Sequence, residues 1–213
     1  MIGGHLFQAA PLIWVTEHLL LSLVHQKALQ KFVSLEFTNS IGAIRWLLFC
    51  MIFYLSPEER ELALQEASRR QGVNEQHNAS GRNGGASRGS LALFYHRVGA
   101  AGEVAVATYL GLKDYLFKDK SPIRGSYDLP WNIDVKTRTK HNYDLIVQLD
   151  DRPDKIYWLV TIENKSIIIH GWIPHEECIK DKYIKDPAGG RKAYFVPKEI
   201  LYAPESFDRD GKN

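Results

Sequence analysis

The order of the elements predicted in the second half of this 213-residue chain constrains its fold most, because one helix is followed by a run of strands. Apolar and small residues recur at helical intervals over 91–110, and Gly111 suits the helix end. The strand-like segments are 125–129, 133–139, 143–149, 156–162, 166–173 and 193–197, and a short helix is expected at 174–181. A helix followed by mostly hairpin-linked strands predicts an α/β (α+β) domain built on a mixed β-sheet flanked by helices.

Residues 1–50 differ in composition from the rest of the chain, with five charged and 29 apolar side chains. Two apolar stretches, 6–24 and 41–55, stand out, but charged residues such as Glu17 and Arg45 interrupt them. A membrane span needs about 20 consecutive apolar residues, so neither stretch is a clean span. Two interpretations remain open for this segment. It is either a real hydrophobic helical extension, with a membrane-associated hairpin as one form, or an over-extended reading frame that is not part of the native protein.

The second interpretation places the true start at Met51, which opens a short apolar lead into a well-capped helix. Ser56 is a good N-cap, Pro57 suits the first helical position, and Glu59 completes a capping box. Residues 71–90 are rich in Gly, Asn and Ser and predict a flexible linker.

Three parts are therefore expected along the chain. They are the hydrophobic extension 1–50, the capped helix with its linker over 51–90, and the main domain 91–213.

Bulk charge and cysteine usage narrow the function classes. The net charge is only +2, so attraction to nucleic acid must come from a local basic patch. The two cysteines, Cys50 and Cys178, show neither the spacing of a zinc site nor a disulfide framework, and a reducing, cytoplasmic setting is expected.

The segment 125-GSYDLPWNIDVKTRTKH-141 carries an unusual density of charge among strand residues. If Leu129 pairs with Ile133 across a tight hairpin, Asp128 lies opposite Asp134, and neighbouring carboxylates repel unless a cation lies between them. Magnesium binds such oxygen ligands, using one or two carboxylates together with waters and substrate phosphate. The spacing also predicts that Trp131 is an exposed loop residue.

Strand alternation places Asp134, Lys136, Arg138 and Lys140 on one face, and their apolar and threonine neighbours on the other. Two acids, an adjacent ammonium and further positive charge are what phosphodiester hydrolysis needs. A cation and Lys136 neutralise charge on the phosphate, Lys136 orients or helps to deprotonate the attacking water, and the flanking basic residues hold the backbone. The alternative is that both aspartates are surface residues with ion-pair partners.

Asp128 followed by Asp134-Val135-Lys136 resembles the D…(D/E)xK signature of the PD-(D/E)xK nuclease superfamily, and the pattern is similar to small phage-encoded nucleases. The resemblance spans about residues 51–200 and is strongest over 99–140. It implies a restriction-endonuclease-like fold and a Mg²⁺ (or Mn²⁺) site held by Asp128, Asp134 and the backbone carbonyl of Val135. It also implies a further acid from the preceding helix, a role that Glu103 matches.

The same resemblance implies DNA as the partner and leaves a homodimer open. Arg138, Lys140 and His141 are the expected nucleic-acid contacts, and Gln148 on the following strand is a further candidate near the metal. The expected function is a Mg²⁺-dependent deoxyribonuclease. The alternatives are a non-catalytic nucleic-acid-binding module on the same fold and a membrane-associated protein with a cytoplasmic domain.

Overall fold

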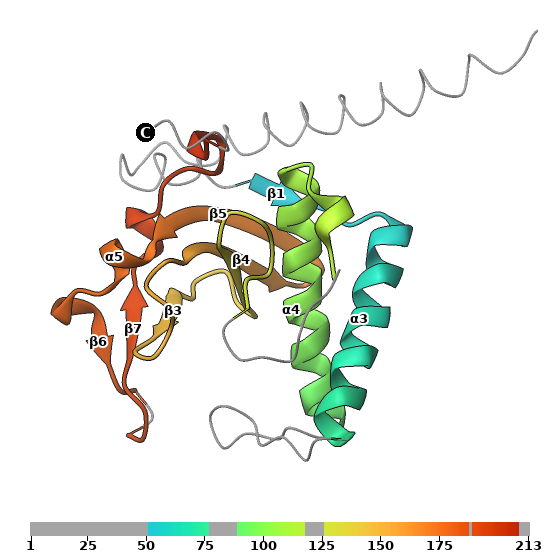
Figure 1. Cartoon of the computed structure of the whole chain (residues 1–213), viewed down its shortest axis with the longest axis horizontal. Coiled ribbons are helices and arrows are strands. Elements are labelled where there is room, and N and C mark those ends of the chain that lie inside the picture. The colour runs from blue at the N-terminus through green and yellow to red at the C-terminus, as the bar shows by residue number, and fades with distance from the viewer. Residues whose placement is uncertain (1–50, 77–88, 118–125, 188, 209–213) are drawn as a thin grey trace, which may run out of the picture. The chain divides into compact units, whose positions relative to one another are not determined.

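A computed structural model describes residues 51–76, 89–117, 126–187 and 189–208 (Figure 1). The extension 1–50 and the central part of the expected linker lie outside these residues. The described residues all belong to one compact unit. No helix among the described residues is both long enough and apolar enough to cross a membrane.

Two long helices precede the strands. Helix α3 (Pro57–Gln76) packs along α4 (Gly89–Tyr109), and a short α5 (His175–Cys178) follows later. The predicted capping box is confirmed, because the Glu59 N–H donates to Ser56 Oγ at 3.2 Å and the Ser56 N–H donates to Glu59 Oε2 at 2.8 Å. The predicted stop after α4 is also confirmed, since Gly111 has a φ of 67°.

The described strands form two sheets. The larger has the order β1-β5-β4-β2, with β1 at Met51–Phe53, β2 at Ile133–Arg138, β4 at Ile156–Glu163 and β5 at Ser166–Pro174. Strands β2 and β4 run parallel and the other pairs are antiparallel, so this sheet is mixed. The smaller antiparallel sheet has the order β3-β7-β6, with β3 at Leu145–Gln148, β6 at Ile184–Lys185 and β7 at Ala193–Val196.

The predicted α+β class is thus confirmed, with two sheets and three α-helices among the described residues. The expectation of a single sheet of mostly hairpin-linked strands was wrong. The parallel pairing of β2 with β4 needs a crossover, and the connecting chain contributes β3 to the second sheet. Residues 126–128 are not a strand, and Leu129 makes only an isolated bridge. Residues 71–76, expected in the linker, continue α3.

Each face of the larger sheet has its own core. Ile133, Val135 and Trp158 pack with α4 on one face, while Tyr157 and Leu159 pack with the smaller sheet on the other. Close packing of α4 against β2 depends on a small residue, Gly102. A Cβ atom added to Gly102 would lie 2.0 Å from Thr137 Oγ1. Figure 1 shows α4 between the larger sheet and α3. The alternation along β2 therefore directs the side chains of Asp134 and Lys136 to the face away from α4.

Candidate functional site

The predicted hairpin between Asp128 and Asp134 is present. Leu129 and Ile133 form an antiparallel bridge, and the Asp128 N–H donates to the Ile133 carbonyl at 2.8 Å. The turn needs two successive residues in the left-handed region, with φ of 58° at Trp131 and 60° at Asn132. The Trp131 side chain is 43% exposed, as its loop position predicted.

The carboxylate of Asp128 binds the free edge of β2. Its Oδ2 accepts the Val135 N–H at 2.8 Å. The N–H and C=O of one strand residue point to the same side, and β4 occupies the other side of β2. The Val135 carbonyl therefore faces the same edge as the Asp128 carboxylate, which is the placement that the resemblance requires of it.

Asp134 is buried and ion-paired to two lysines. Its Oδ1 lies 2.9 Å from Lys136 Nζ, and its Oδ2 contacts Lys155 Nζ. Lys155 is itself only 4% exposed, although lysine is rarely buried unless it is paired. The alternative interpretation was that Asp134 is a surface residue with ion-pair partners. The ion-pair partners are confirmed, but the surface position is wrong because Asp134 is buried.

The ammonium group of Lys136 lies near several carboxylates of the site. Beyond Asp134, its Nζ lies 3.5 Å from Asp151 Oδ2 in the loop that leads to β4. Burial lowers the pKa of the Lys136 ammonium, but the charges of Asp134, Asp151 and Asp128 outweigh burial and raise the pKa above its ordinary value. Lys136 is therefore cationic at neutral pH, and it can orient and neutralise an anion but cannot take up a proton.

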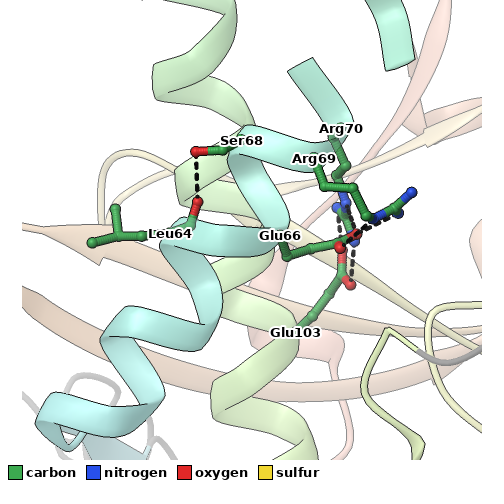
Figure 2. Close-up of polar contacts among 6 residues, drawn as sticks. All are labelled: Leu64, Glu66, Ser68, Arg69, Arg70 and Glu103. Atoms are coloured by element: carbon green, nitrogen blue, oxygen red, sulfur yellow. Dashed lines mark hydrogen bonds and ion pairs between the residues drawn. The ribbon is translucent and has the colours of Figure 1, made fainter. Parts of the chain in front are cut away.

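Glu103 lies on α4, on the other side of the larger sheet. Figure 2 shows the carboxylates of Glu66 and Glu103 converging on Arg70 of α3. Arg70 donates to both Glu103 oxygens at 2.8 and 2.7 Å and to Glu66 Oε1 at 2.7 Å. Burial opposes the charge on Arg70, but the bonds to the two glutamates outweigh it and raise its pKa. The structure thus brings Asp128, Asp134 and Lys136 together and leaves Glu103 in a separate cluster.

The three predicted nucleic-acid contacts lie at the end of β2 and directly after it. Arg138 lies over the Tyr143 ring at 4.9 Å, and the Lys140 ammonium lies 5.7 Å from the same ring. His141 is anchored, since its Nδ1 hydrogen-bonds Thr161 Oγ1 at 2.7 Å and its N–H donates to Glu163 at 3.1 Å. Arg138 and Lys140 thus share a contact with Tyr143, whereas His141 is bonded to β4.

A cavity of about 750 Å³ opens beside this cluster. It lies between the edge of β2 and the face of β3 and β7 that carries Gln148 and Phe195. Lys136, Arg138 and Arg191 supply its cationic groups.

Three residues of this region were not predicted. Asp151, Lys155 and Arg191 come from loops whose local patterns resemble ordinary solvated turns. The run 150-DDRPDK-155 before a strand was the available signal, because its charges stand next to a buried segment.

Among the described residues, no group of three His, Cys, Asp or Glu side chains is arranged to hold a metal ion. Comparison with family models, curated proteins and solved structures gives no match for this chain.

Proposed function

We propose that this protein is a Mg²⁺-dependent nuclease that hydrolyses phosphodiester bonds in DNA. The observation that carries the proposal is the gathering of Asp128, Asp134 and Lys136 at the free edge of β2, beside a cavity with further cations. The resemblance to the PD-(D/E)xK superfamily supports the same assignment. The order of α4, the Asp128 hairpin and a mixed sheet is in keeping with the restriction-endonuclease-like fold.

The donor set at this edge suits a hard divalent cation. Asp128, Asp134 and the Val135 carbonyl offer oxygen ligands, and a magnesium site needs only one or two protein carboxylates because water and substrate phosphate supply the rest. Among the described residues, the carboxylates of Asp134 and Asp151 lie beside the ammonium group of Lys136, and Lys155 contacts Asp134. A carboxylate that binds lysine retains further lone pairs for a cation.

The bound cation would supply positive charge at the phosphate and would favour ionisation of the attacking water. The chain's own groups do the rest. Lys136 is held cationic by its three acidic neighbours and neutralises charge that grows on the scissile phosphate. Lys155 holds Asp134 in place from the opposite side. Arg138 and Lys140 bind the flanking backbone.

Cleavage of plasmid and single-stranded DNA with Mg²⁺ or Mn²⁺ tests the proposal. We expect Asp134→Asn and Lys136→Met to reduce kcat by about 100-fold or more, since each removes charge from the transition state. Asp181→Asn and Lys180→Gln are matched controls at exposed positions outside the cluster, and they should retain full activity.

The structural role of the ion pairs must be separated from catalysis. Asp134→Asn removes the ion-pair partner of Lys155 and one of the acidic neighbours of Lys136, so each variant should be assayed at a temperature where circular dichroism shows it folded. Activity that survives both substitutions at the wild-type level would refute the nuclease assignment.

A non-catalytic nucleic-acid-binding module is the second candidate. It is favoured by one observation, namely that both oxygens of Asp134 are already paired with lysine. This function predicts salt-sensitive DNA binding through Arg138 and Lys140 and no affinity for divalent cations. Calorimetric titration with Mn²⁺ separates the two candidates. A nuclease should release or absorb heat as it binds Mn²⁺, and the Asp128→Asn variant should not, whereas the binding module should show no Mn²⁺ binding in either protein.

A further inference from the structure

The cavity beside Lys136 has two chemically different walls. One is the edge of β2, which ends in Arg138. The other is the outward face of the smaller sheet, where Gln148 pairs with Ala193 and Ile146 pairs with Phe195. Its volume of about 750 Å³ falls within the range of roughly 300–1,000 Å³ that small-molecule pockets occupy.

Arg138 is a half-buried cation on the wall formed by β2. Within the described residues its guanidinium makes no ion pair, and its contact is with the face of Tyr143 at 4.9 Å. Burial lowers the pKa of Arg138 below its ordinary value and outweighs the opposing charges of Tyr143 and Asp144. A guanidinium that loses hydration without gaining a carboxylate is suited to receive an anion, and its fork geometry matches phosphate.

Gln148 provides an unused polar group on the opposite wall. Its Oε1 is buried and accepts no hydrogen bond from the described residues, although its backbone N–H is held by Asp151 at 3.2 Å. Turning the amide about its last bond therefore breaks no hydrogen bond, and either its oxygen or its nitrogen can be presented to the cavity. An amide of this kind can pair with the donor and acceptor on the edge of a nucleobase.

Phe195 lies two residues from Ala193 on the same strand and lines the same cavity. Aromatic faces bind bases by stacking with little regard to base identity. Ala193 lines the same cavity, and its small side chain adds little bulk to this wall.

From these three groups we infer that the cavity binds one nucleotide of a single-stranded nucleic acid, with its phosphate on Arg138, its base against Phe195 and the base edge on Gln148. The inference rests on the proposed function and specifies its substrate. A paired base presents its edge to its complement, so only an unpaired or extruded base can enter such a pocket.

Binding without cleavage tests this inference directly. Full-length protein in EDTA is titrated by fluorescence anisotropy against short labelled dA, dC and dT homopolymers and against the dA·dT duplex. We expect at least about ten-fold tighter binding of the best single strand than of the duplex, since stacking contributes about 1–3 kcal/mol per base, or about 5- to 150-fold.

Three variants test the contacts with the base face, the base edge and the phosphate separately. Phe195→Leu keeps apolar contact but removes the aromatic face and should weaken binding of all single strands by about five-fold or more. Gln148→Leu should remove the affinity differences among the homopolymers. Arg138→Gln should lower affinity for all of them and reduce the slope of log K against log salt by about 0.7. Lys180→Gln, an exposed cation outside the cavity, is the matched control and should change none of these quantities.

Equal affinity for duplex and single strand would overturn the inference, as would a base ranking that Gln148→Leu leaves unchanged. Because the binding assay is carried out in EDTA, its outcome can be compared with a separate cleavage assay in Mg²⁺. Single-strand selectivity without cleavage in Mg²⁺ would refute the proposed function and support the pocket, whereas cleavage with duplex preference would do the reverse.

Discussion

Replacing Arg70 with methionine should destabilise the protein by about 3 kcal/mol. Glu103, with 4% of its side chain exposed, would lose the two hydrogen bonds and the charge that Arg70 supplies, while Glu66 would keep Arg69 at 2.7 Å. The dominant cost is thus the loss of the guanidinium from a buried carboxylate, and removing one member of a buried ion pair costs about 3–5 kcal/mol. Urea unfolding at pH 7 measures the difference.

Arg69→Met is the matched control for this variant. Arg69 bonds the same Glu66 but is 49% exposed, so its loss should cost no more than about 1 kcal/mol. Leucine in place of Glu103 in the Arg70→Met background should recover most of the stability, because it removes the buried charge that Arg70 had neutralised. A cost below about 1 kcal/mol for Arg70→Met, or no recovery in the double variant, would refute the reasoning.

A further variant, Glu103→Gln, decides the role of Glu103. If Glu103 only stabilises the packing of α3 against α4, Glu103→Gln lowers the free energy of unfolding and leaves kcat unchanged at a temperature where the variant is folded. If it is a metal ligand, as the resemblance implies, kcat and its dependence on Mg²⁺ concentration change as well.

Two further predictions concern the core. Gly102→Ala should lower the free energy of unfolding in urea by about 1–3 kcal/mol, because the new Cβ would lie 2.0 Å from Thr137 Oγ1. Gly99→Ala is the control, since its Cβ would lie 3.9 Å from Arg70, and it should be neutral or stabilising by up to about 1 kcal/mol. Equal effects of the two substitutions would contradict the close packing at Gly102. Burial, helped by the charges of Lys198 and His141, lowers the pKa of His170 from 6.5 to about 3. The unfolded chain therefore takes up this proton first, and stability should fall by about 1.4 kcal/mol per pH unit below pH 6.5 and level off near pH 3. Wild type should lose about 2 kcal/mol more than His170→Gln between pH 7 and pH 5, and identical pH profiles would refute it.

Local features of this fold were predictable from the sequence. The capping box at Ser56 and Glu59 depends on residues three apart, and the bridge between Leu129 and Ile133 depends on one turn, so spacing alone indicates both. The exposure of Trp131 follows from the same turn.

Long-range partners were not predictable in the same way. Whether β2 pairs with β3 or with β4 depends on which faces are buried by distant elements, and period-two alternation is the same in both cases. The partner of Glu103 is 33 residues away on another helix, and the burial of Lys155 depends on Asp134, 21 residues earlier. No local pattern distinguishes these charges from solvated ones.

The contact between Asp128 and Val135 has a consequence for behaviour in solution. Strand β2 is an edge strand of the larger sheet. An unpaired strand edge is a template onto which a second molecule can add a strand. By accepting the Val135 N–H, the Asp128 carboxylate occupies one of the donors that such an intermolecular ladder would use. Variants of Asp128 should therefore be checked by light scattering, since turbidity would indicate self-association through β2.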